Sequence, residues 1–520
     1  MKLVIFVVFT ILDYVCGARI LCVFQMPAFS HQRVFQPIWR ELSLRGHEVV
    51  VVTPIPLKDP LLTNLTEIDV SAPNSELIRR HGFQFFMNKE YAVHTKIPKI
   101  FAMHYDFAEV ILKNEEFSKI YNNSNQKFDV VIAQTYISPI LYSIAAKFKA
   151  PLIGISSMGA YIGTHFAMGN PNPPSLYSEM FLPYNGKLTL YERIKSTTYY
   201  LFVRFYRTFV ILPEADALAR KYLGNDIPYI EDIERNMSLL LITTNPFMYT
   251  PRPTIPTIVS LESIHVKPTE PLPQDLKKFL DESKEGVIYF SLGSNVQSVN
   301  IPGRVRDTLI AAFSELPYKV LWKFEADTLP NQPKNVITRK WLPQKDVLAH
   351  PNIKAFVSQC GLQSLEESIS RAVPIVALPF IADQEMNAQR LAELGVAVNL
   401  NYVTFTKEEL KKAIIEIAEN SKYRKNMERL RQIWTDQPMS SLDRAVWWIE
   451  YVIRYQGTPH LRSPIADISW IEYLLLDVIC VVVTVGLTVL YILKLLAGSL
   501  CKLCTKNSRK QKSRENKKLK

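Results

Sequence analysis

Short apolar segments alternate with amphipathic helical segments along most of this chain, and this alternation restricts the fold more than any other feature. Residues 19–24 are a continuous apolar run, a helix is expected over about residues 32–45, and a second apolar run covers residues 48–53. A strand, a crossover helix and a strand within 35 residues predict a βαβ unit, whose two strands are parallel. The pattern recurs at residues 128–155 and between residues 286 and 378. The chain is therefore expected to form parallel sheets covered by helices.

A proline-rich stretch divides these units into two sets. Residues 267–274 hold three Pro in eight residues, which favours a stiff, extended linker. We therefore expect an N-terminal domain over residues 18–266, a linker over 267–276 and a C-terminal domain over 277–470. Ligands of open α/β sheets bind beyond the carboxyl ends of the strands. Two doubly wound domains that face each other would enclose a binding cleft.

Both ends of the chain indicate a membrane protein. Residues 1–17 combine a charged start, an apolar run and a small-residue end, which is typical of a signal peptide. Residues 474–493 are apolar except for Asp477, and twenty helical residues span about 30 Å, the thickness of the bilayer hydrocarbon. A buried core helix is the alternative, but the Lys-rich sequence that follows has nothing with which to cover it. The sequence predicts a single transmembrane helix.

The charge distribution excludes a nucleic-acid partner and predicts the topology. The net charge is +12, but residues 494–520 hold ten Lys or Arg and a single acid, so the rest of the chain carries only +3. No general basic field remains to bind phosphate backbones. The positive-inside bias keeps this basic tail cytoplasmic and the body lumenal, as in a single-pass type I protein in contact with membrane lipid.

The final residues and three sequons refine this location. The terminus contains Lys517 and Lys518 and resembles the dilysine retrieval signal of endoplasmic-reticulum membrane proteins. We therefore expect the protein in the endoplasmic-reticulum membrane. Asn64, Asn122 and Asn236 each begin an Asn-x-Ser/Thr sequon and are candidate glycosylation sites.

The segment from residue 341 to residue 387 carries the chemistry. A strand over residues 355–358 ends at a Gly turn, and a helix is expected to start near Ser364. A helix N-terminus with free amides, Gly361 for close approach and a hydroxyl can hold a phosphate. Glu367 lies three residues beyond Ser364, so a capping box is its structural alternative. Trp341 is either a core residue or a platform on which a nucleobase stacks.

Together these pieces resemble the nucleotide-sugar signature of the UDP-glycosyltransferase family, in particular its membrane-bound animal, arthropod-like branch. The matching patterns are Trp-x-Pro-Gln, Gly-x-x-Ser-x-x-Glu, Val-Pro-Ile and Ala-Asp-Gln-x-x-Asn. The resemblance extends to residues 30–31, 45–47, 168–171 and 290–294. It implies a GT-B fold, in which two Rossmann-like domains face a cleft, with one C-terminal transmembrane helix.

The resemblance also implies which residues hold a UDP-sugar: Ser294, Trp341, Gln344, Gln359, Gly361, Ser364, Glu367, Asp383 and Gln384. In the family pattern, Trp341 stacks on uracil and Gln344 holds the uridine. Glu367 accepts hydrogen bonds from the ribose hydroxyls.

The remaining members of this set are expected at the diphosphate and the sugar. Ser294, Gly361 and Ser364 would line the diphosphate. Asp383 and Gln384 would hydrogen-bond the sugar hydroxyls.

His31 matches the general base of the family, in the first βα loop. It would take the proton of an acceptor alcohol or phenol as this attacks the anomeric carbon, while UDP leaves from the opposite face. Backbone amides and the helix dipole would stabilise the leaving diphosphate. The UDP-sugar is a co-substrate, and the resemblance implies neither a metal nor another cofactor.

Two residues depart from the family pattern. Gln359 stands where the family usually has His beside the phosphates, and supplies no positive charge. Gln134 stands where many members have an acid that orients the catalytic His. A neutral amide cannot stabilise an imidazolium, so the base is expected to be weaker.

Two functions are compatible with these residues. The first is an active hexosyltransferase that uses UDP-glucose on small lipophilic acceptors, with the apolar residues 160–205 shaping the acceptor site. The alternative, favoured by the two Gln substitutions, is a weakened relative that binds UDP-sugar and acts as a regulator or scaffold. Such a relative could associate with other glycosyltransferases, and self-association is also possible.

Overall fold

The computed structural model describes residues 17–81, 93–179, 181–182, 184, 186–245 and 247–518. The predicted signal peptide, apart from Gly17, lies outside the described residues. The chain divides into two compact units, which join between Ser463 and Pro464.

A sheet of seven parallel strands forms the centre of the first domain, in the order β3-β2-β1-β4-β5-β6-β7. The strands are β1 (Arg19–Val23), β2 (Glu48–Thr53), β3 (Leu65–Asp69), β4 (Val130–Gln134), β5 (Leu152–Ser156), β6 (Leu239–Ile242) and β7 (Ile258–Ser260). The helices between them are α2 (Phe29–Leu44), α3 (Ser71–His81), α5 (Val93–Lys113), α6 (Glu115–Tyr121), η1 (Ile140–Tyr142), α7 (Ser143–Phe148), α8 (Ile162–Ala167), α9 (Leu190–Tyr206), the π-helical turn η2 (Arg207–Ile211), α10 (Leu212–Leu223) and α11 (Ile230–Arg235). The predicted parallel sheet is confirmed.

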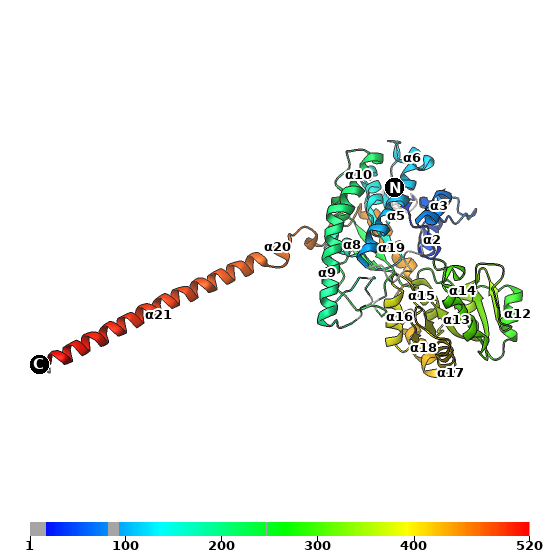
Figure 1. Cartoon of the computed structure of the whole chain (residues 1–520). Coiled ribbons are helices and arrows are strands. Elements are labelled where there is room, and N and C mark those ends of the chain that lie inside the picture. The colour runs from blue at the N-terminus through cyan, green and yellow to red at the C-terminus, as the bar shows by residue number, and fades with distance from the viewer. Residues whose placement is uncertain are drawn as a thin grey trace, which may run out of the picture. The chain divides into compact units, whose positions relative to one another are not determined.

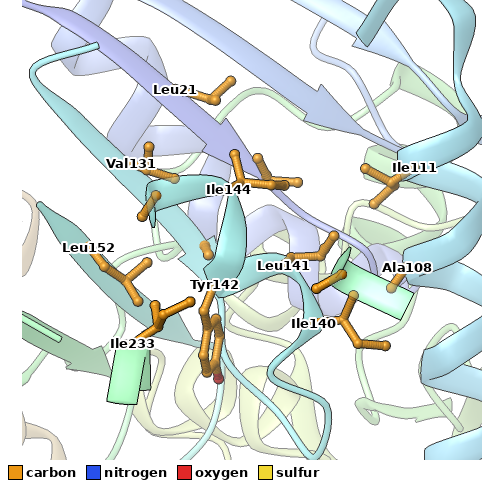
Figure 2. Packing of buried hydrophobic residues seen from close by; sticks show 14 of the residues in the cluster. Leu21, Ala108, Ile111, Val131, Ile140, Leu141, Tyr142, Ile144, Leu152 and Ile233 are labelled. Atoms are coloured by element: carbon orange, nitrogen blue, oxygen red, sulfur yellow. The ribbon is translucent and has the colours of Figure 1, made fainter. Parts of the chain in front are cut away.

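Apolar strand residues and apolar helix residues interlock in the core of this domain. Figure 2 shows Leu21, Val131 and Leu152 from three neighbouring strands packed with helical side chains that include Ile144 and Ile111. All five are buried, and each such burial contributes roughly 1.5–3 kcal/mol of transfer free energy. Because helices cover both faces of the sheet, its inner strands β4, β5 and β6 are buried along their whole length, whereas the edge strand β3 keeps exposed polar residues.

The second domain contains a sheet of six parallel strands in the order β10-β9-β8-β11-β12-β13. The strands are β8 (Val287–Ser291), β9 (Lys319–Lys323), β10 (Val336–Arg339), β11 (Ile353–Ser358), β12 (Ile375–Ala377) and β13 (Ala397–Asn399). Its helices are α12 (Gln274–Glu282), η3 (Ser298–Asn300), α13 (Gly303–Ser314), α14 (Gln344–Leu348), α15 (Leu362–Ser370), α16 (Gln384–Glu393), α17 (Lys407–Glu419) and α18 (Ser421–Thr435). Two doubly wound domains are therefore present, as predicted.

One helix from the region expected to form the second domain, α19 (Ser441–Tyr455), returns to the first. Its apolar side chains Ala445, Val446, Ile449 and Val452 are buried in one cluster with residues of β1, β2, β4 and β5. In Figure 1, α19 lies with α2, whereas α17 and α18 lie with the second domain. The predicted C-terminal domain of residues 277–470 included α19, because it follows the other helices of that domain in the sequence. Local patterns show that one face of α19 is apolar, but they do not reveal which sheet that face covers.

The C-terminal unit contains the helix α21 (Leu476–Lys518), preceded by η5 (Pro464–Ala466) and α20 (Trp470–Tyr473); η4 (Pro459–Leu461) lies just before the unit. By length and composition alone, α21 is sufficient to cross a membrane, and its apolar stretch is not buried by protein. The helix begins two residues later than the predicted span of residues 474–493. Leu474 and Leu475 precede it, and Leu475 has a φ of 53°, which is not helical. The helix also continues through the basic tail, since Lys and Arg are good helix formers.

Candidate functional site

A cavity of about 300 Å³ lies at the carboxyl ends of strands from both sheets. It is lined by every residue that the sequence analysis placed at the UDP-sugar and by the predicted base: His31, Ser294, Trp341, Gln344, Gln359, Gly361, Ser364, Glu367, Asp383 and Gln384. Parallel strands bring their carboxyl ends to one edge of a sheet, which explains how residues so distant in sequence share one cavity.

His31 occupies the first turn of α2, because the helix begins at Phe29 rather than near residue 32 as predicted. Its Nδ1 lies 2.5 Å from Oγ of Ser157, in the loop that follows β5. Burial lowers the pKa of His31 to about 4, so the imidazole is neutral at pH 7. When Nδ1 donates to Ser157, Nε2 keeps the lone pair that a general base needs.

Gln134 serves a different purpose from the one expected at its position. Its Oε1 accepts hydrogen bonds from the backbone amides of Gln25, at 3.1 Å, and Met26, at 2.9 Å. Gln134 therefore shapes the loop that leads to His31, and Ser157 is the residue that contacts the ring. Ser157 was not predicted from the sequence, although a hydroxyl directly after an apolar strand of the same sheet was a signal that could have identified it.

The part of the cavity where the sequence predicts the nucleobase presents an exposed aromatic ring. Trp341 is 54% exposed, so the core alternative for this residue is wrong. The Phe29 ring meets it edge-on, at 4.9 Å between centroids and 89° between planes. Nζ of Lys323 lies 5.4 Å from the centroid of the indole. A fixed, solvent-accessible ring of this kind can stack on a base.

Gln344 connects Ser364, which was expected at the diphosphate, with Glu367, which was expected at the ribose. Its Nε2 donates to Oγ of Ser364 at 3.0 Å and to Oε2 of Glu367 at 2.7 Å. The capping-box alternative is wrong, because α15 begins at Leu362 with Gly361 as N-cap and no side chain caps it. Burial raises the pKa of Glu367, and the hydrogen bond from Gln344 partly opposes this rise.

Where the sequence predicts the diphosphate, two buried polar atoms, Oγ of Ser294 and Oε1 of Gln359, have no hydrogen-bond partner among the described residues. Buried polar atoms in native proteins are nearly always paired, so atoms left free in a cavity point to a ligand. Gly293 lies beside them with φ of 73°, and a Cβ there would lie 2.5 Å from Nε2 of Gln359. The N-terminus of α15 adds free amides, so this end can hold an anion.

Where the sequence predicts the sugar, Oδ2 of Asp383 accepts a hydrogen bond from Nδ2 of Asn387 at 2.8 Å. Burial raises the pKa of Asp383 to about 6. Oε1 of Gln384 accepts from the backbone amides of Phe380, at 2.8 Å, and Ile381, at 2.9 Å. The carboxamide oxygen of Gln384 is therefore occupied, and only its amide nitrogen remains for a sugar hydroxyl.

Two further cavities share lining residues with this one. One of about 100 Å³ has a mixed lining in which apolar surface predominates. Its polar residues are His31, Lys96, Gln134, Thr135, Ser157, Asn295, Asp383 and Gln384, and its apolar or aromatic residues are Met26, Ile100, Met103, Tyr136, Met158, Phe181 and Ile381. The other, of about 240 Å³, is also lined by Met158 and Asp383, and by Ala160 and Ile162. The segment predicted to shape an acceptor site thus contributes to both. His31 lines the smaller, apolar cavity as well as the largest one.

Direct hydrogen bonds join the two domains to each other. Nε2 of Gln363, in α15, donates to the backbone oxygen of Ser157 at 2.9 Å. The hydroxyl of Tyr249 donates to Oδ1 of Asn387 at 2.9 Å. Ser157 therefore contacts both His31 and the helix that begins at the diphosphate end.

Outside the cavities, the three sequon residues Asn64, Asn122 and Asn236 are all exposed, as glycosylation requires. Within the described part of the chain, no cluster of three or more His, Cys, Asp or Glu is arranged to hold a metal ion.

Comparison with known proteins agrees with this geometry. Residues 19–515 match the model of the family described as UDP-glucoronosyl and UDP-glucosyl transferase. UDP-glucosyltransferase 2 of Dactylopius coccus is 34% identical over 96% of each chain. Ecdysteroid UDP-glucosyltransferase of Spodoptera littoralis nuclear polyhedrosis virus is 29% identical over 92% of this chain and 96% of its own. The crystal structure of TcCGT1 in complex with UDP aligns with a TM-score of 0.57 and 17% identity, over 85% of this chain and all of that one.

Proposed function

Because the chain belongs to the UDP-glucoronosyl and UDP-glucosyl transferase family, and so transfers sugar from a UDP-sugar, we propose that it glucosylates small lipophilic acceptors with inversion at the anomeric carbon. The observation that carries the proposal is the position of His31, which lines both the large polar cavity and the small apolar cavity. A base at this junction can meet an acceptor on one side and a sugar on the other.

In this proposal the large cavity holds UDP-glucose. Uracil stacks on Trp341, the ribose hydroxyls donate to Glu367, and the diphosphate lies against Ser294 and the N-terminus of α15. Gln344 orients Glu367 through the hydrogen bond of 2.7 Å. The glucose reaches Asp383, which also lines both acceptor-side cavities.

The transfer is a single displacement. An acceptor hydroxyl in the apolar cavity gives its proton to Nε2 of His31 as its oxygen bonds to the anomeric carbon. The bond from that carbon to the UDP oxygen breaks on the opposite face, so the configuration inverts and UDP leaves. Amides at the start of α15 and the hydroxyl of Ser294 stabilise the charge on UDP.

The surroundings of His31 favour acidic acceptors. The neutral hydroxyl of Ser157 fixes the ring but cannot stabilise an imidazolium, and the pKa of about 4 makes His31 a weak base. Phenols ionise readily and need less help than alkyl alcohols, so phenols are the expected better substrates. The name of the viral relative, an ecdysteroid UDP-glucosyltransferase, supports a small lipophilic acceptor.

We further propose that α21 anchors the enzyme in the endoplasmic-reticulum membrane with the catalytic body in the lumen. The length and apolar composition of α21 and the basic residues at its end support this location.

A UDP-release assay tests the proposal. Microsomes from cells that express the full chain should release UDP from UDP-glucose when phenols are added, and release less with matched alkyl alcohols. UDP-glucuronic acid serves as the alternative donor. Release from UDP-glucuronic acid alone would refute the choice of glucose. Release no greater than in microsomes without the chain, across the whole panel, would favour the regulator or scaffold.

The contact between Ser157 and His31 makes a separate prediction. Ser157→Ala should lower kcat about tenfold, because the neutral ring loses the partner that holds its tautomer. A tenfold loss corresponds to a rise of about 1.4 kcal/mol in the barrier, which is close to the net contribution of one hydrogen bond. Ser157→Thr keeps a hydroxyl and should restore most of the rate. The KM for UDP-glucose should change little in either variant. Equal kcat in both variants and the wild type would show that Ser157 does not position the base.

A further inference from the structure

Helix α9 and the turn η2 present an apolar stripe to solvent. Leu190, Ile194, Leu201, Phe205 and Phe209 are each more than half exposed, and the rings of Phe205 and Phe209 lie 4.7 Å apart. The spacing of four and seven residues places them on one face of the helix. Monomeric soluble proteins rarely expose contiguous apolar surface of this kind, so such a stripe marks an interaction site.

The opposite face of α9 packs against residues that line the acceptor-side cavities. Tyr199 and Val203 are buried in one cluster with Ile100 and Ile162. Ile100 lines the small apolar cavity, and Ile162 lines the cavity of about 240 Å³. A single helix thus separates the exposed stripe from the residues that enclose the acceptor.

Cations border the stripe. Lys187, Arg193 and Lys195 are all exposed, and Nζ of Lys195 lies 4.5 Å from the ring centroid of Tyr191. The only acidic side chain of α9 is Glu192, which is engaged in the capping box with Thr189. An apolar face with basic residues at its border is typical of a helix that lies in the bilayer interface, where the apolar side chains enter the membrane and the cations meet lipid phosphates.

The chain itself keeps this surface near a membrane if α21 is inserted. Residues 464–475 connect the end of the compact body to the first residue of α21. Twelve extended residues reach at most roughly 40 Å, so the body stays within that distance of the bilayer.

We propose that the outer face of α9 and η2 docks on the lipid bilayer in which α21 is anchored. The apolar stripe enters the interfacial region, and Lys187, Arg193 and Lys195 lie at the headgroups. Lipophilic acceptors dissolved in the bilayer then reach the enzyme beside the wall of its acceptor cavities. The proposal rests on the membrane anchor proposed above and adds a second, peripheral contact.

Photo-crosslinking of the full chain in phosphatidylcholine–phosphatidylserine vesicles tests this contact. p-Benzoylphenylalanine is placed at Phe205 and, as the control, at Leu61, which is 82% exposed in the loop between β2 and β3. Lipid adducts should be at least ~5-fold more abundant from position 205, because interfacial side chains are embedded among headgroups and acyl chains. Equal yields would overturn the proposal. Adducts at 205 with a second copy of the chain, rather than with lipid, would overturn it in favour of a dimer interface.

Two further measurements separate the docking surface from the anchor. Alkaline carbonate should leave the full chain in the vesicles, and its release would show that the anchor, and docking with it, is wrong. Replacing Phe205 and Phe209 together by Asp should raise the KM for a phenol with a long alkyl chain several-fold and leave the KM for a water-soluble phenol unchanged. Unchanged KM values for both acceptors, with the chain retained in the vesicles, would refute docking while leaving the anchor intact.

Discussion

The variant His31→Ala is expected to lose at least ~10²-fold in kcat, because a general base typically contributes 10²–10⁴-fold. The imidazole lies between the two cavities, and without it the acceptor proton must pass to water as the new bond forms. Donor affinity should hardly change, because in the proposed mechanism His31 acts on the acceptor and contributes little to the binding of UDP.

Turnover with UDP-glucose and a phenol, together with calorimetric binding of UDP, distinguishes loss of the base from loss of the fold. His460→Ala is the matched control, since His460 is exposed and contacts Tyr451 away from the cavities. Alkyl alcohols should suffer more than phenols in the His31 variant. Turnover equal to wild type across the acceptor panel would remove His31 from the mechanism.

The second large effect is expected at the nucleobase. Trp341→Ala should weaken UDP binding by ~1–3 kcal/mol, which is the usual contribution of one base–aromatic stack. This corresponds to roughly 5- to 150-fold in Kd. Because the indole is 54% exposed, its removal should leave the melting temperature nearly unchanged.

Titration calorimetry with UDP measures this loss directly. Trp341→Phe keeps an aromatic face and should recover part of the affinity. Trp447→Ala removes another half-exposed Trp, on α19, that does not line the cavity, and serves as the control. If Trp341→Ala and Trp447→Ala bind UDP equally tightly, the base does not stack on Trp341.

The sequence determined the fold class because its evidence was local. Apolar runs such as residues 48–53 and the helix that follows residues 19–24 show their periodicity within a single βαβ unit, and chain connectivity then requires parallel strands. The nucleotide-sugar signature was also local. Ser364 and Glu367 lie on one helical turn, so their proximity follows from spacing alone.

The tertiary structure decided everything that depends on contacts between distant segments. His31 and Ser157 are 126 residues apart, and only the order of β1, β4 and β5 in the sheet brings them together. Gln134 occupies the strand end between them, yet bonds to the backbone of the loop before α2. In the same way, α19 is an amphipathic helix by sequence, but which sheet it covers depends on the path of the folded chain. Periodicity records which face of an element is buried, whereas the partner of that face is a property of the whole fold.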